Sequence, residues 1–122
     1  MDAGEAIRLN PSDAEAYYNR GVSEGTLGEY TKSIDDFSAA IRLNPNDPEY
    51  YCNRGISLER QGDYSKAVGD FTQAIRLRGD YAKAYFHRSA SRDKTGDYSG
   101  AVSDSNQVMR LDPSVYKRRA KE

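Results

Sequence analysis

Two residues of this chain could carry covalent or metal chemistry: Cys52, its single cysteine, and His87, its single histidine. If they approached each other, the thiol and the imidazole could act as a nucleophile and its general base, or provide two ligands to a metal ion. No third residue at a useful spacing would orient the imidazole or complete a metal site. We therefore expect both side chains to line a surface without doing chemistry, and the sequence predicts neither a catalytic residue nor a metal site.

The other polar residues form no motif that binds a cofactor. The sequence has no phosphate-binding loop and no dinucleotide fingerprint. Its carboxylates stand singly beside basic residues, which is typical of solvated helix faces with ion pairs. We expect a protein that is not an enzyme and that needs no cofactor.

Charge and hydropathy narrow the class of partner. The 122 residues include 18 basic and 19 acidic side chains, so the net charge is -1. Such a balance disfavours binding to nucleic acid or to an anionic membrane, and RNA binding stays only a weak alternative. No apolar run approaches the roughly 20 residues that span a bilayer. With a single cysteine and no secretory signal after Met1, the sequence leaves the compartment undefined and favours the cytoplasm.

The elements that position these residues repeat along the chain. A segment that begins at Tyr17 recurs at Tyr51 and again at Tyr85, with an offset of 34 residues each time. The same offset relates Gly28, Gly62 and Gly96. A fixed period of this length is typical of solenoids, in which each unit buries its apolar face against its neighbours.

Each unit predicts two helices. In the first unit, segment 14–27 ends at Gly28, a residue suited to the left-handed conformation that stops a helix. Segment 30–43 follows with apolar residues at helical spacing, and Pro45 ends it. Ser12 with Glu15 predicts a capping box for the first helix.

The units resemble the tetratricopeptide repeat. The resemblance rests on three kinds of position. An aromatic residue stands at Tyr17, Tyr51 and Tyr85, and a small residue where the two helices of a unit touch stands at Gly21, Gly55 and Ser89. A large residue of the second helix stands at Phe37 and Phe71. Ser105 departs from the last position, and Glu24 and Arg92 depart from an apolar position that only Leu58 fills. Arginine replaces the usual leucine at Arg20, Arg54 and Arg88, which resembles a Tyr-x-Asn-Arg-Gly variety of the family.

The resemblance implies an all-α fold, a right-handed α-solenoid of helix-turn-helix repeats. The register divides the chain into a partial helix at 1–11, repeats at 14–47, 48–81 and 82–115, and a partial helix at 116–122. The partial helices suggest a section of a longer array, or open ends that stack on another copy.

In tetratricopeptide repeat proteins, which these units resemble, the first helix of each unit lines a concave groove that holds a partner. On this sequence the groove residues are expected to be Glu15, Tyr18, Asn19, Val22, Cys52, Asn53, Ile56, Lys83, Phe86, His87 and Ala90. Asn19, Asn53 and His87 recur at one register position and could hydrogen-bond the backbone of an extended peptide. They could equally satisfy neighbouring groups of the protein itself.

Some members of the family clamp the acidic C-terminal tail of a chaperone with lysine, asparagine and arginine side chains. The matching positions hold Tyr18, Val22, Asn53, Lys83 and His87. Only Asn53 and Lys83 carry the clamp residue types, so we expect a different ligand.

The arginines have a structural interpretation. Arg20, Arg54 and Arg88 are each followed sixteen residues later by an aspartate, at Asp36, Asp70 and Asp104. This spacing predicts an ion pair between the two helices of each unit. Arg42, Arg76 and Arg110 are expected to form a solvated outer stripe near helix C-termini, where they complement the helix dipole.

The sequence as a whole predicts a protein-interaction scaffold that binds a peptide or protein segment in the concave groove. The alternatives are a structural array that self-associates end to end, and a non-catalytic module of a larger enzyme or regulator.

Overall fold

The computed structural model describes residues 2–115, which fold into seven α-helices and contain no strand. The helices are α1 (Ala3–Leu9), α2 (Ala14–Thr26), α3 (Tyr30–Leu43), α4 (Pro48–Arg60), α5 (Tyr64–Leu77), α6 (Ala82–Lys94) and α7 (Tyr98–Leu111). Segment 116–122, for which the sequence predicts a further partial helix, lies outside the described residues.

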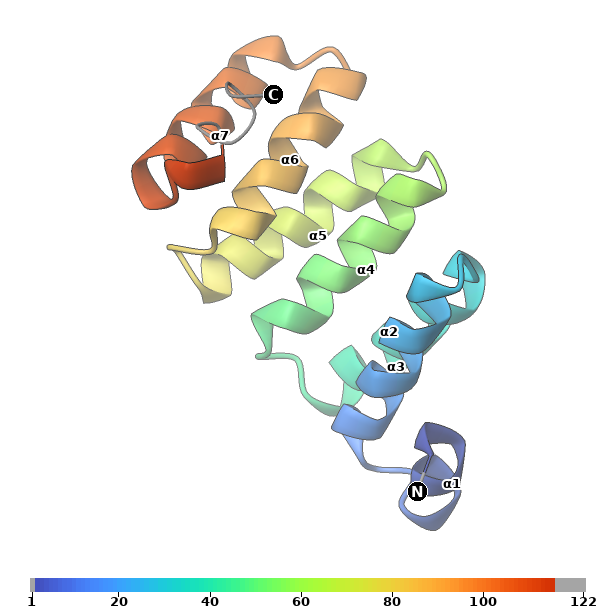
Figure 1. The fold of residues 1–122 in the computed structure, drawn as a ribbon. Helices are drawn as coiled ribbons and strands as arrows, with labels where there is room; N and C mark the ends of the chain where they lie inside the picture. Colours follow the sequence, from blue (N-terminus) through green and yellow to red (C-terminus); the bar gives the residue numbers. More distant parts are fainter. Residues whose placement is uncertain (1, 116–122) are drawn as a thin grey trace.

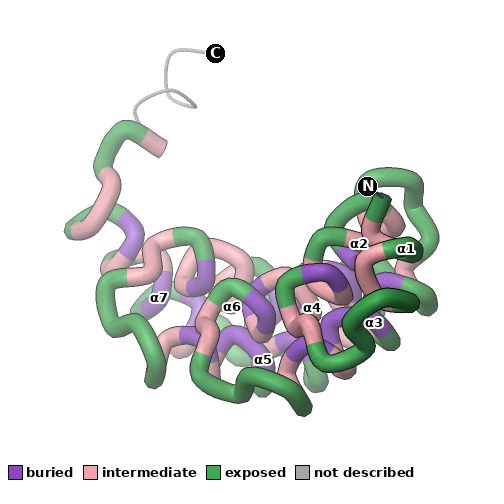
Figure 2. The backbone as a smooth tube through the Cα atoms, turned by 90° about the horizontal axis from the view of Figure 1, so that it is seen from below, coloured by how far each residue is buried: buried purple, intermediate pink, exposed green. Residues whose placement is uncertain are grey.

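The helices pair into three antiparallel hairpins, α2–α3, α4–α5 and α6–α7, which stack into an elongated solenoid (Figure 1). Helix α1 packs beside α2 at one end of the stack, and α7 lies at the other end. Buried residues concentrate where helices face one another, while exposed residues follow the turns and the edges (Figure 2). The all-α solenoid that the repeat predicted is therefore the observed fold.

Glycines terminate the first helix of every hairpin. Gly28, Gly62 and Gly96 have positive φ angles of 81°, 85° and 86°, a conformation that costs side-chain-bearing residues free energy. Because the chain changes direction at Gly28, the backbone N–H of Glu29 donates a hydrogen bond to the carbonyl oxygen of Glu24 at 2.8 Å. This bond satisfies one of the carbonyl groups left free at the helix end.

The helix starts are only partly as the sequence predicts. Asp47 caps α4, and its side chain accepts a hydrogen bond from the backbone N–H of Glu49 at 2.9 Å. The capping box expected from Ser12 is wrong, because Asp13 is the N-cap residue of α2 and accepts from the backbone N–H of Ala16. Aspartate is as good an N-cap as serine, and α2 begins at Ala14, where the predicted segment begins.

The core runs along the middle of the solenoid as a repeated contact between a glycine and a phenyl ring. Phe71 is fully buried, and a Cβ atom built on Gly55 would lie 2.6 Å from its Cε1 atom. Phe37 meets Gly21 in the same way in the first hairpin. Only glycine allows the two helices of a hairpin to approach so closely at this point.

The three predicted arginine–aspartate pairs are confirmed. Arg54 donates from Nε and Nη2 to the two carboxylate oxygens of Asp70, both at 2.8 Å. The equivalent pairs are Arg20 with Asp36 and Arg88 with Asp104, with shortest distances of 2.7 Å. The aspartates are buried, so these are not the exposed bridges that contribute little free energy. Each pair fixes the spacing of its hairpin through a two-pronged contact.

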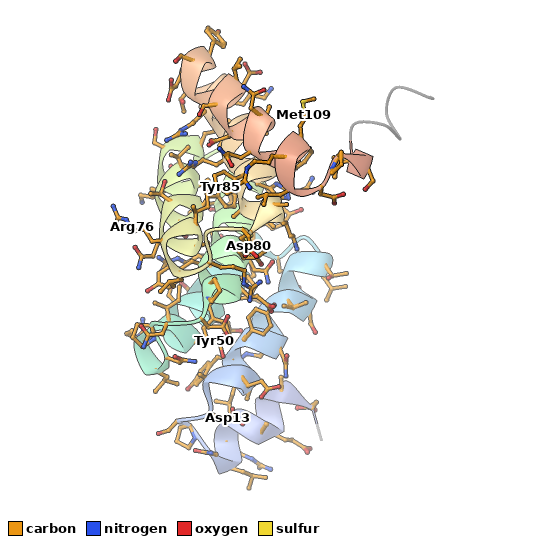
Figure 3. The ribbon with its side chains drawn as sticks, turned by 90° about the vertical axis from the view of Figure 1, so that its left-hand side faces the viewer. Asp13, Tyr50, Arg76, Asp80, Tyr85 and Met109 are labelled. Atoms are coloured by element: carbon orange, nitrogen blue, oxygen red, sulfur yellow. The ribbon has the colours of Figure 1, made fainter. Side chains whose placement is uncertain are left out.

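The outer helices carry an exposed arginine near their C-termini. Arg76 projects away from α5 into solvent, as expected for the outer stripe of arginines (Figure 3). No helix in the described part of the chain is long and apolar enough to cross a membrane.

Candidate functional site

The first helices of the three hairpins form one continuous layer. Helix α4 contacts both α2 and α6, whereas no contact joins α3, α5 and α7 to one another in the described region. The helices α2, α4 and α6 therefore lie on the tighter, inner side of the stack, where the sequence predicts the groove.

A cavity of about 680 Å³ opens on this layer, and we call it the inner groove. Six of the predicted groove residues line it: Tyr18, Val22, Asn53, Ile56, Lys83 and His87. They come from all three inner helices, so the fold brings residues from three repeats to one site. This set includes all five positions that correspond to the chaperone-tail clamp, although three of them carry other residue types.

A short hydrogen-bonded chain crosses the groove between α2 and α4. Asn53 donates from Nδ2 to the hydroxyl of Tyr18 at 2.7 Å, and that hydroxyl donates to Glu49 at 3.4 Å. Burial, followed by the charge of Glu49, raises the pKa of Tyr18 to about 12. The carbonyl oxygen of Asn53 accepts no hydrogen bond from the described residues and so remains open to a ligand.

The groove also has basic lining residues on α4 and α6. Arg60, Lys83 and His87 line it, and no carboxylate is among the described lining residues. Arg60 and Lys83 are exposed and form no ion pair within residues 2–115. Two unpaired positive charges therefore face the cavity of a protein whose net charge is -1.

His87 is held by neighbours on two helices. Its Nδ1 atom lies 3.0 Å from Glu59, which also accepts a hydrogen bond from Ser91 at 2.9 Å. The imidazole ring stacks on Phe71, with 5.7 Å between ring centroids. Burial of Glu59 opposes its ionisation, but the hydrogen bonds from His87 and Ser91 outweigh burial and hold its pKa below the usual range.

Cys52 does not line the groove, which corrects the expectation from sequence. Its side chain is fully buried in a core cluster with Ala67, Phe71 and Ala84. Burial raises the pKa of the thiol to about 11, which disfavours the reactive thiolate. No hydrogen bond links Cys52 to His87 in the described residues, so the two do not form a nucleophile and base.

Four other predicted residues lie outside the inner groove. Glu15 and Asn19 are exposed on α2, and neither lines a described cavity. Phe86 and Ala90 line an adjoining cavity between α6 and α7, which shares Arg60 and His87 with the inner groove. The Asn19–Asn53–His87 series is therefore not a uniform row, because Asn53 and His87 each bind a residue of the preceding inner helix and Asn19 has no such neighbour.

Sequence reasoning missed several residues of the inner groove, above all Arg60 and Thr26. Each lies four residues after a predicted groove residue, Ile56 and Val22 respectively, so helical periodicity alone could have found them. Tyr30 and Phe37 belong to α3 and reach the groove across the helix pair. Phe37 does so in contact with Gly21, one of the small residues that the sequence pattern places where the two helices of a unit touch.

No group of three or more histidine, cysteine, aspartate or glutamate side chains suitable for a metal ion occurs in residues 2–115.

Comparison with known proteins agrees with the repeat architecture. Residues 26–62 match the family model described as TPR repeat, and residues 48–81 match the model described as Tetratricopeptide repeat. The matched residues, 26–81, carry tetratricopeptide repeats, and members of that family are protein-interaction modules. No curated protein sequence matches it.

Solved structures with the same fold include MamA, with a TM-score of 0.88 and 19% sequence identity over 91% of this chain. The chain spans 65% of the length of that MamA chain, and the likeness concerns the fold alone. The first repeat domain of Spaghetti (RPAP3), bound to the HSP90 peptide SRMEEVD, has a TM-score of 0.81 and 27% identity, covering 82% of this chain and 79% of its own. The Arabidopsis OM64 domain gives a TM-score of 0.81 and 25% identity, covering 88% and 93%.

Proposed function

We propose that this chain is a scaffold that binds an extended, acidic segment of another protein in the inner groove. The observation that carries the proposal is the pairing of an open carboxamide, Asn53, with the unpaired cations Arg60 and Lys83 in a cavity without lining carboxylates. The HSP90 peptide bound to the RPAP3 domain supports a peptide as the ligand.

Each part of the groove has a chemical counterpart in such a ligand. The Asn53 carbonyl can accept a hydrogen bond from a peptide N–H. Arg60 and Lys83 can pair with an acidic side chain, which would gain charge-assisted hydrogen bonds. The apolar surfaces of Val22 and Ile56 can receive an apolar residue of the same segment.

The ligand is expected to differ from a chaperone tail. Tyr18 and Val22 replace two of the polar clamp residues on α2, so the cationic wall lies on α4 and α6 instead. We expect the groove to grip an acidic side chain within a segment rather than a free C-terminal carboxylate.

A selection experiment tests the proposal. Random displayed peptides are selected on the immobilised chain, and the affinity of the enriched peptides is measured for Arg60→Glu and for Arg76→Glu. Both variants change the charge equally, but Arg60 lines the groove and Arg76 projects from the outer stripe (Figure 3).

We expect peptides rich in aspartate and glutamate, with at least about tenfold weaker binding to the groove variant. Equal losses in both variants, or peptides without acidic residues, would reject the proposal.

A second candidate, end-to-end self-association, rests on the exposed face of α7. Val102 and Met109 are 61% and 54% exposed, and Met109 projects from the end of the stack (Figure 3). Their counterparts one repeat earlier, Val68 and Ile75, are half-buried beneath the next hairpin. The N-terminal end of a second copy could cover this face in the same way. Light scattering that stays monomeric at all concentrations would reject this candidate, whereas an oligomer that Met109→Glu dissociates would support it.

A further inference from the structure

The third hairpin lacks the glycine–phenyl contact that fills the first two. Ser89 stands where the others have Gly21 and Gly55, and Ser105 stands where they have Phe37 and Phe71. The two hydroxyl oxygens lie 2.8 Å apart, and Ser89 donates a hydrogen bond to the backbone carbonyl oxygen of Ala101, also at 2.8 Å. Two hydroxymethyl groups occupy less volume than the benzyl group they replace.

The third hairpin keeps the ion pair of the other two. The Arg88–Asp104 pair retains the two-pronged geometry of the other hairpins, with distances of 2.9 and 2.7 Å. Arg92 adds a third contact to Asp104 at 2.9 Å. The ion pair thus keeps α6 and α7 in the pairing of the other hairpins, and two small hydroxyl groups in contact stand where those hairpins have a phenyl ring.

A cavity of about 570 Å³ lies at this place, and we call it the α6–α7 hollow. Ser89 and Ser105 are among its described lining residues, together with the apolar side chains of Phe86, Tyr98 and Val102. Tyr98 and Val102 are 65% and 61% exposed, so the hollow presents apolar surface to solvent.

Repeat symmetry relates the hollow to the inner groove. Phe86, Ser89, Tyr98 and Ser105 occupy the register positions that Tyr18, Gly21, Tyr30 and Phe37 occupy in the wall of the inner groove. The hollow is thus the third-repeat counterpart of that wall, with the phenyl ring removed from its floor.

The charge around the hollow differs from that of the inner groove. Glu59 and Asp93 line the hollow beside Arg60 and His87, so both signs are present. Glu59 is already engaged by His87 and Ser91. The hollow therefore favours an uncharged group, and its apolar lining favours a large flat one.

We propose that the α6–α7 hollow receives an aromatic side chain of the bound segment, which takes the place that the rings of Phe37 and Phe71 take in the other hairpins. A tyrosine would find an acceptor as well, because the Ser105 hydroxyl retains lone pairs after its contact with Ser89. This inference deepens the proposed function and rests on it for the origin of the side chain, but the hollow can be tested without a peptide.

The test uses p-cresol, the side-chain analogue of tyrosine, titrated into the isotope-labelled chain and followed by NMR. The key variant is the double substitution Ser89→Gly with Ser105→Phe, which rebuilds the contact of the other hairpins. Ser105→Phe alone should clash, since a Cβ atom at the glycine position lies within 2.7 Å of the ring in the first hairpin. Asn106→Phe is the matched control, because it adds the same ring at the next, exposed position of α7.

We expect p-cresol to shift the amide signals around Ser89, Ala101 and Ser105 in the wild type and in Asn106→Phe. The double variant should bind it at least about tenfold more weakly and should melt no lower than the wild type, which shows that the ring occupies the hollow in a folded chain. Equal binding to the double variant, shifts confined to other helices, or no binding would each overturn the proposal. If Arg60→Glu does not weaken peptide binding but p-cresol still binds the wild type, the acidic ligand of the inner groove is rejected. The aromatic site in the α6–α7 hollow would then still be supported.

Discussion

Gly55 and the ring of Phe71 are in such close contact that a methyl group on Gly55 would lie 2.6 Å from Cε1 of the ring. Alanine in a helix interior normally stabilises a protein relative to glycine by about 1 kcal/mol. Here overpacking against a fully buried ring should cost roughly 1–3 kcal/mol. We therefore expect Gly55→Ala to lower the free energy of unfolding, measured with urea, by up to about 2 kcal/mol.

Gly69→Ala is the control for that measurement. Gly69 lies inside α5, is exposed, and has no atom within 4 Å of an added Cβ. It should stabilise the chain by up to about 1 kcal/mol. A gain of stability in both variants would contradict the close contact.

The Arg54–Asp70 pair should be a main determinant of stability. Arg54→Ala leaves a buried carboxylate without its partner, so the free energy of unfolding should fall by about 2–3 kcal/mol. Lys66→Ala removes the exposed pair with Asp63, at 3.8 Å. This variant should change the free energy of unfolding by no more than about 0.5 kcal/mol. Similar losses in both variants would show that the buried pair contributes no more to the free energy of unfolding than the exposed pair does.

Glu24 should make stability depend on pH. Burial, then a hydrogen bond and repulsion from Asp36, raise its pKa from 4.5 to about 7. Because the folded chain holds this proton more tightly than the unfolded chain does, its contribution is complete below about pH 4.5 and is lost as the pH rises through 7.

The second hairpin has leucine at the same register position, Leu58. Glu24→Leu should therefore raise the melting temperature more at about pH 8 than at about pH 5. Asp35→Asn, an exposed change of equal charge on the neighbouring helix, should have no such pH-dependent effect. A Glu24→Leu gain that is independent of pH would contradict the assignment.

Cys52 should be unreactive in the folded chain. Its burial and its pKa of about 11 deprive a thiol reagent of both access and thiolate. The reagent should modify Cys52 only at the rate of unfolding, and rapidly in urea. Fast modification under native conditions would contradict the burial of Cys52 and show that its thiol is accessible from the groove.

The fold could be predicted from the sequence because each local signal repeats. The offset between Tyr17, Tyr51 and Tyr85 fixes the period, and glycines with positive φ end each first helix. The Arg54–Asp70 type of pair also follows from spacing alone. The N-cap residue of α2 did not, since Ser12 and Asp13 are both good caps and only the path of the chain selects between them.

The site was less predictable because side-chain direction depends on packing. Cys52 shares the inner helix α4 with Asn53, yet it points into the core while Asn53 faces the groove. Arg60 was missed although it lies one helical turn beyond Ile56. The α6–α7 hollow arises from two departures from the repeat, Ser89 and Ser105, whose joint effect appears only when α6 and α7 are paired.

The most direct test of the central claim is an NMR map of a selected acidic peptide on the isotope-labelled chain. If the peptide binds in the inner groove, the amide signals that shift should cluster around Asn53, Arg60 and Lys83 on α4 and α6, and those of α3 and α5 near the outer stripe should stay unchanged. Shifts that cluster around Arg42 and Arg76 on the outer helices, with none in the groove, would contradict the account.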